Sequence, residues 1–142
     1  MRKSSVTWAF QMAKFFESRE ELFLYALRDC IDGSCIAIAF SHTPLGNQLE
    51  GWLEAAIHDG GIPESILTDH ALSADNEALS NWARRRSVTV ISATPVTAMP
   101  DERMMRSALR RLEEVSPNHS NLNSLAVLHA LAEWRIDYNL HL

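Results

Sequence analysis

The sequence predicts a single α/β domain in which three antiparallel strands precede an alternation of helices and short strands. Three observations predict this class. The 142 residues suit one folding unit. Period-two apolar patterns give three strands before the first helical pattern, and two further short apolar strands separate the helical patterns that follow. Because consecutive strands come first, we expect residues 1–142 to form a mixed five-stranded sheet flanked by helices rather than a doubly wound parallel sheet.

The first strand is indicated by strict alternation, which places Val6, Trp8, Phe10 and Met12 on one face and Gln11 on the other. A polar hairpin turn follows it. The second and third strands are predicted at residues 22–27 and 35–40, with a turn at 31–34 between them.

The remaining elements are predicted from helical spacing and from residues that start or stop helices. Leu49, Leu53 and Ile57 repeat at a spacing of four, and Gly60 and Gly61 end that pattern. The expected elements are a helix opening at Thr43 and Pro44, a strand at 65–68, a helix from Ser73 or Asp75 to about Arg85, a strand at 88–91, a helix from Pro100 to about Val115, and a helix from Asn121 to about Tyr138 that carries Leu125, Leu128, Ala132 and Ile136.

Composition indicates a packed cytoplasmic protein. Hydrophobic residues make up 46% and charged residues 22%, as in ordinary globular domains. The net charge of −5 argues against a general phosphate-binding protein, but acidic residues that hold Mg²⁺ would also make a nucleic-acid enzyme acidic. Cys30 and Cys35 lack zinc-site spacing and are expected as buried thiols. No apolar stretch is long enough to span a membrane, so no membrane partner is expected.

Several short motifs follow one another in a fixed order along the chain. They are Trp8 in the first strand, Asp29 to Ile38 around the second turn, Gly61-Ile-Pro63 followed by Ile66 and Asp69, Trp82 in the next helix, Pro95 followed by Glu102-Arg103 and Arg106-Ser107, and Trp134 followed by Asp137, Tyr138 and Asn139.

This order resembles the catalytic core of retroviral integrases and bacterial insertion-sequence transposases, which has an RNase H-like fold. The resemblance covers nearly the whole chain. It implies DNA integration by phosphodiester transfer that depends on Mg²⁺ or Mn²⁺, with three carboxylates holding two metal ions. Asp69 matches the second carboxylate and Glu102 the third, and both are expected as catalytic metal ligands. No other cofactor is implied.

The first carboxylate position departs from the family pattern, because it falls on Gln11. Glutamine is neutral and offers one carbonyl oxygen, so it is a poor ligand for a divalent ion. His70 and Ala71 stand where the family has Asn-Gly, and the loop between Pro95 and Glu102 is shorter than in these families. Together these changes predict a degenerate centre with impaired catalysis, a pseudoenzyme, and leave open whether the chain is an enzyme.

Some residues keep an alternative interpretation. Asp75 and Asn76 preserve the Asp-Asn pair, but their distances from Gly61 and to Trp82 do not fit the motif. His70 is either a substrate or metal contact or an ordinary loop histidine. A set of basic residues would either contact DNA phosphates or simply be solvated on helix faces. This set is Arg84, Arg85, Arg86, Arg103 and Arg106.

Two other functions remain open at this point. One is a non-enzymatic module derived from a transposase, which would form a homodimer, associate with DNA or bind an intact transposase. The other is an RNase H-like nuclease that hydrolyses nucleic acid without joining it. The nuclease would need the same carboxylates as an integrase, so cleavage of duplexes without strand joining would distinguish it.

Overall fold

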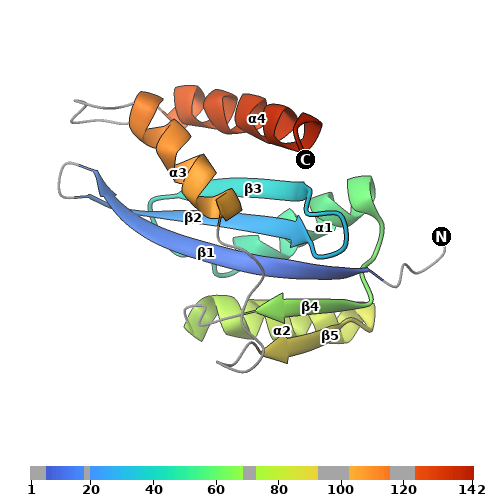
Figure 1. Ribbon diagram of the computed structural model, residues 1–142. Helices are drawn as coiled ribbons and strands as arrows, with labels where there is room; N and C mark the ends of the chain where they lie inside the picture. The colour runs from blue at the N-terminus through green and yellow to red at the C-terminus, as the bar shows by residue number, and fades with distance from the viewer. Residues whose placement is uncertain (1–5, 18–19, 69–72, 93–102, 116–123) are drawn as a thin grey trace.

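A computed structural model describes residues 6–17, 20–68, 73–92, 103–115 and 124–142. One mixed sheet with strand order β3-β2-β1-β4-β5 lies between two pairs of helices (Figure 1). This confirms the predicted fold class. The elements are β1 (Thr7–Glu17), β2 (Glu20–Asp29), β3 (Cys35–Ser41), α1 (Gln48–Gly60), β4 (Ser65–Thr68), α2 (Ser73–Arg86), β5 (Thr89–Ser92), α3 (Arg103–Val115) and α4 (Ser124–Leu140).

Strand β1 is central and joins two differently built halves of the sheet. It pairs antiparallel with β2, where Trp8 lies opposite Asp29, and parallel with β4, where Trp8 lies opposite Ile66. β5 continues the parallel half. β3 continues the antiparallel half and forms one edge, and its pairing with β2 is interrupted by an irregularity next to Arg28. The parallel and antiparallel halves therefore meet at β1.

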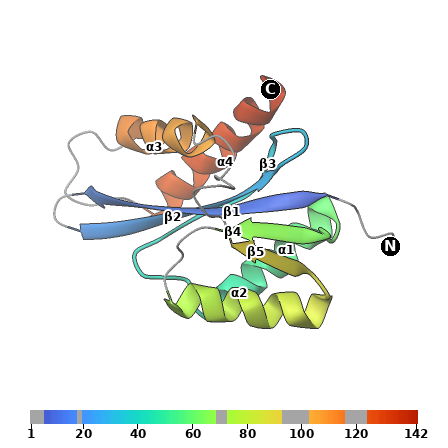
Figure 2. The same cartoon turned by 60° about the horizontal axis from the view of Figure 1, so that its bottom comes forward.

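The alternation of β1 divides the interior into two hydrophobic cores, one on each side of the sheet. The two helix pairs that cover these cores lie on opposite sides of the sheet in Figure 2. Trp8 and Phe10 lie on one face, as the sequence predicted, and this face is covered by α1 and α2. On the opposite face, the neighbouring strand β2 contributes Leu24 and Ala26, which belong to the same cluster as Met104 of α3 and residues of α4. Even-numbered and odd-numbered side chains of the central strand therefore face different cores.

Helix α1 begins later than predicted, at Gln48 rather than at Thr43 and Pro44. The intervening backbone turns through Gly46, whose φ of 51° lies in the left-handed region that glycine tolerates. The backbone N–H of Leu45 donates to the Tyr25 hydroxyl at 3.2 Å, which ties this turn to β2. Because this glycine breaks the helical pattern, the helix starts after it rather than at Thr43 and Pro44.

The apolar set predicted for α4 is not the face that packs on the sheet. Leu128 is 52% exposed and Ile136 is 61% exposed, whereas Val127, Leu131 and Trp134 are buried. The helix carries apolar side chains on nearly its whole circumference, so periodicity alone offers two competing faces. The face with Trp134 packs inward, and the other face leaves an exposed apolar stripe.

Helices α1 and α2 are joined by charged and polar contacts at their outer surface. The indole N–H of Trp82 donates to Glu54 at 2.6 Å, and Arg86 Nε donates to the same carboxylate at 2.8 Å. Arg85 forms an ion pair with Glu50 one turn earlier on α1. Because Trp82 is fully buried, Glu54 is the acceptor that satisfies its indole N–H.

The Glu54 contacts predict a pH-dependent contribution to stability. The hydrogen bond from Arg86 lowers the pKa of the Glu54 carboxyl below its ordinary value. Its contribution is therefore present above the unfolded pKa of about 4.3 and is lost as the pH falls through the lower folded pKa. Since Glu54 is 39% exposed, we expect Glu54→Gln to lower the free energy of unfolding by less than about 1 kcal/mol at neutral pH. In urea titrations this difference should disappear at acid pH.

Glu54→Leu serves as the comparison variant. It removes the acceptor for the Trp82 indole, which glutamine retains, and so should cost about 1–3 kcal/mol. That loss should persist at acid pH. Equal losses for the two variants at every pH would contradict the role assigned to Glu54.

Candidate functional site

Gln11 is a buried polar residue on the central strand. It lies opposite Ala26 of β2, on the face covered by α3 and α4, and is 5% exposed. Its Oε1 atom has no hydrogen-bond partner among the described residues. A buried amide oxygen without a partner costs free energy, and such atoms are rare in folded proteins. Position 11 therefore holds a polar group that packing alone does not explain.

The end of β4 lies beside this position in the middle of β1, and the start of α3 packs on the same side of the sheet. Phe10 pairs with Thr68, the last residue of β4, and Gln11 is the next residue of β1. Helix α3 begins at Arg103, and its second residue, Met104, is buried in the same cluster as Ala26. Open sheets present binding sites at the carboxyl ends of parallel strands, and β4 ends next to Gln11.

The two predicted carboxylates lie outside the described residues. Asp69 follows Thr68 directly and Glu102 precedes Arg103 directly, but residues 69–72 and 93–102 are not described, and His70 falls in the same gap. The side chains of Asp75 and Asn76 are also outside the described set. Of the three predicted metal-binding positions, the structure therefore places Gln11 alone.

Gln11 does not fit a centre of three carboxylates. Its amide supplies one neutral oxygen, whereas Mg²⁺ binds best to charged oxygen ligands. In the part of the chain that is described, no three His, Cys, Asp or Glu side chains gather into a group that could hold a metal. The Oε1 atom of Gln11 can accept a hydrogen bond or weakly ligate a cation.

The basic residues divide between the two sides of the sheet. Arg84, Arg85 and Arg86 end α2, on the side opposite Gln11, and Arg85 and Arg86 pair with acids of α1. Arg103 and Arg106 are exposed on α3, which covers the face that carries Gln11. Only Arg103 and Arg106 therefore lie on the same side of the sheet as the candidate site.

The motif that closes the domain has a structural role that sequence analysis missed. Asn139 accepts a hydrogen bond from the Cys35 backbone N–H at 2.8 Å and donates to the Cys35 carbonyl at 3.0 Å. Arg135 Nε donates to the same carbonyl at 2.9 Å. Trp134 Nε1 donates to Ser107 Oγ of α3 at 2.9 Å. The motif thus clamps α4 onto α3 and onto the start of β3.

The two cysteines are free and differ in burial. Cys35 is buried, as predicted, and burial raises the pKa of its thiol to about 12. Cys30 is only half-buried, although burial also raises its pKa. Both thiols are therefore protonated at neutral pH, which does not favour a nucleophilic role.

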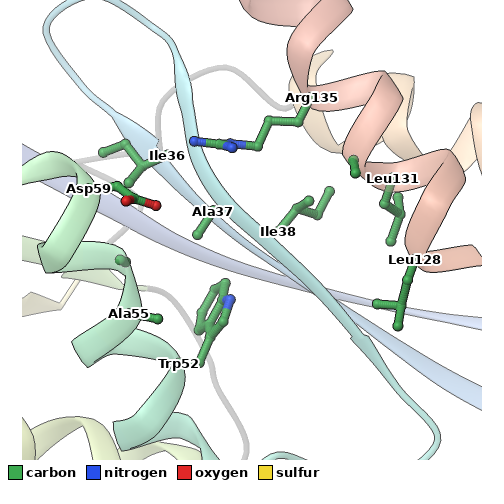
Figure 3. A pocket seen from close by; sticks show the side chains of 11 residues that line it. Ile36, Ala37, Ile38, Trp52, Ala55, Asp59, Leu128, Leu131 and Arg135 are labelled. Atoms are coloured by element: carbon green, nitrogen blue, oxygen red, sulfur yellow. The ribbon is translucent and has the colours of Figure 1, made fainter. Parts of the chain in front are cut away.

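A groove lies along the edge of the sheet between α1 and α4 (Figure 3). Its volume is about 310 Å³, and its floor is formed by residues 36–38 of β3. Trp52 of α1 and Leu128 of α4 give it apolar walls, and Asp59 and Arg135 line it from opposite sides. The Trp52 side chain is half-buried and lines the groove.

The fold is that of a retroviral integrase catalytic core. A chain of the simian T-cell lymphotropic virus intasome in complex with PP2A regulatory subunit B56 gamma superposes with a TM-score of 0.69 at 18% identity, over 89% of this chain and 47% of that one. This protein thus spans about half of that chain. The dimeric form of the HTLV-2 integrase catalytic core domain in complex with magnesium gives a TM-score of 0.65 at 16% identity, covering 89% and 83% of the two chains.

The catalytic core domain of BIV integrase gives a TM-score of 0.66 at 13% identity, over 92% of this chain and 83% of that one. No family model matches the sequence. No curated protein matches it either. At these identities the likeness establishes the fold, and the predicted integrase-core architecture is confirmed. No helix of the described residues is long and apolar enough to cross a membrane.

The clamp at Cys35 predicts a measurable loss of stability. Asn139→Ala removes both the acceptor for the Cys35 N–H and the donor to its carbonyl. Since Cys35 is buried, we expect a loss of about 1–3 kcal/mol in the free energy of unfolding. Asn47→Ala is the matched control, because Asn47 makes no side-chain capping bond at α1 and is exposed. Chemical denaturation of both variants checks this, and equal stability would argue against the clamp.

Proposed function

We propose that this protein is an integrase-core domain in which the metal-dependent centre for DNA strand transfer is impaired. The observation that carries the proposal is Gln11, which is buried and uncharged on β1 beside the end of β4, and whose Oε1 has no hydrogen-bond partner among the described residues. The fold supports it, since a related core, the HTLV-2 integrase catalytic core domain, is known in complex with magnesium. In this proposal Asp69 and Glu102 are the remaining ligands of Mg²⁺ or Mn²⁺.

The charge at the first ligand position affects how strongly the proposed site binds metal ions. Two divalent ions bound at one site carry four positive charges, and several negatively charged ligands are needed to offset them. Replacing one carboxylate by an amide removes a unit of negative charge and leaves a neutral oxygen in a buried position. When a metal ion is bound, it stabilises the attacking and leaving oxygens at a phosphodiester. A site with weakened affinity would bind the ions rarely and would perform little transfer.

DNA is the proposed partner, with contacts centred on α3. Arg103 and Arg106 are exposed on the helix that covers the Gln11 face, so their guanidinium groups are placed to meet phosphates near the site. The predicted contribution of the α2 arginines is less favoured, because Glu50 and Glu54 already pair with two of them. The overall charge of −5 favours a local rather than a general affinity for DNA.

Restoring the carboxylate tests the proposal directly. We expect Gln11→Asp to bind Mn²⁺ at least tenfold more tightly than the unchanged protein in calorimetric titration, because the new charge completes the ligand set. Without metal the variant should melt at a lower temperature, since a buried carboxylate is costly, and Mn²⁺ should raise that temperature again.

Ala9→Asp is the matched control. Ala9 is fully buried on the same face of β1, two residues before Gln11, so its replacement adds a charge without completing the ligand set. It should be destabilised without rescue by Mn²⁺. Equal Mn²⁺ binding by the unchanged protein and Gln11→Asp, or rescue of both variants, would contradict the proposed site.

A second function, a non-catalytic dimerisation module, is supported by the groove between α1 and α4. The exposed apolar stripe of α4 borders this groove, and Asp59 and Arg135 place opposite charges on its two walls. A patch that contains both partners of a charge pair can be self-complementary under a twofold axis, which is what a homodimer requires. The HTLV-2 core is known in dimeric and trimeric forms.

The dimer proposal predicts that a charge in the groove keeps the protein monomeric. Leu128→Glu places a carboxylate on the apolar wall and should reduce the association constant by at least tenfold in sedimentation equilibrium. The control is Ile91→Glu on β5, which is also exposed but lies on the edge strand opposite β3. A monomeric unchanged protein at high concentration, or equal effects of both variants, would remove this second function.

A further inference from the structure

A second pocket lies between α3 and α4, on the outer side of both helices. Its volume is about 340 Å³, which is within the range of small-molecule sites. Ser107, Arg110 and Arg111 line it from α3, and Trp134 and Tyr138 line it from α4. Neither the proposed metal centre nor the groove at β3 uses these side chains as a surface.

One wall of the pocket is a fixed aromatic platform. The Trp134 and Tyr138 rings stack with centroids 5.1 Å apart and an angle of 24° between their planes. Trp134 is held in place because its Nε1 donates to Ser107 Oγ at 2.9 Å. Tyr138 is half-buried, so part of its ring stays accessible beside a rigid partner. Such a platform can stack a planar heterocycle, as aromatic side chains do in proteins that bind single strands.

The opposite wall carries the Arg110 guanidinium group, which forms no ion pair with the described part of the chain. Arg110 is exposed, and no carboxylate of the described residues lies within ion-pairing distance of it. The two acids of the pocket lie nearer to other side chains, since Glu114 is 3.9 Å from Arg111 and Asp137 is 3.5 Å from the His141 ring. The charge of Arg110 is therefore available to an anion from outside.

The pocket is also continuous with the basic face of α3. Arg103, Arg106 and Arg110 are all exposed and are spaced by three and four residues, so they share one face of the helix. This row leads from the start of α3, beside the candidate site, to the second pocket. A phosphate backbone that follows the row would bring one nucleotide to the aromatic platform.

We propose that this pocket is a nucleotide subsite, in which the base stacks beside Tyr138 and the phosphate pairs with Arg110. The inference deepens the proposed association with DNA but does not depend on the metal centre. Both a free nucleotide and one nucleotide of a single strand offer the required chemistry, a planar base and an attached phosphate.

Nuclear magnetic resonance of the tryptophan indoles tests the subsite, because the four tryptophans report on different places. Trp134 lines this pocket, Trp52 lines the groove at β3, and Trp8 and Trp82 are fully buried in the other core. Deoxyadenosine monophosphate, added in EDTA to exclude metal, should shift the Trp134 indole signal and leave the other three unchanged. No shift of Trp134 at millimolar nucleotide would overturn the proposal.

Two arginine variants and inorganic phosphate test which groups of the protein and of the nucleotide are needed for binding. Arg110→Ala should weaken nucleotide binding at least fivefold, whereas Arg84→Ala, an exposed arginine on the opposite side of the sheet, should leave it unchanged. Inorganic phosphate should bind at least fivefold more weakly than the nucleotide. Equal binding of phosphate, or an Arg110→Ala variant that binds normally, would overturn the subsite.

A short single-stranded oligodeoxynucleotide distinguishes the two sources of the ligand. Tighter binding than the mononucleotide supports a strand that also follows Arg103 and Arg106, and equal binding supports a free nucleotide. Because the titrations are made in EDTA, their failure leaves the proposed metal centre untested, and failure of the Gln11→Asp experiment leaves this subsite untouched.

Discussion

The structure depends on one constraint, the alternation of side chains along the central strand β1. Every second residue must suit one of two different cores. Large rings, Trp8 and Phe10, fill the side covered by α1 and α2, while small Ala9 and polar Gln11 face the side of α3 and α4. A shift of one residue would exchange the two sets, so the register with β2 and β4 is fixed by packing on both faces at once. The location of the candidate site follows from this register.

The same constraint explains why Gln11 is functionally informative. The neighbouring positions on its face are alanines, which pack easily under a helix. An apolar residue at position 11 would cost less than a buried amide oxygen that has no hydrogen-bond partner among the described residues. Its polarity is therefore a feature that stability does not account for. The fold shared with retroviral integrase cores does not by itself assign a role to this residue, so the proposed site depends on the chemistry of Gln11 and on the Gln11→Asp test.

Much of the fold could be predicted because its signals are local. The alternation in residues 6–12 and the spacing of Leu49, Leu53 and Ile57 each reflect one element meeting one core. The features that were missed depend on contacts between distant segments. Nothing near Asn139 in the sequence indicates that it bonds to Cys35, 104 positions away. The packed face of α4 was missed because that helix has two apolar sides. The sequence placed Gln11 on the face of β1 opposite Trp8 and Phe10, as the structure has it, while the functional roles of Gln11, Asp69 and Glu102 stay predictions.

The bond between Asn139 and Cys35 has a consequence for folding on the ribosome. Strand β3 is an edge strand, and the polar groups at its first residue are satisfied by side chains of α4 that are synthesised 104 residues later. Until α4 emerges, the sheet can assemble from β1 and β2 onward but its edge lacks this cover. Uncovered edges template pairing with other chains. The nascent domain is therefore most vulnerable to aggregation late in its synthesis, when nearly all of its sheet is already present.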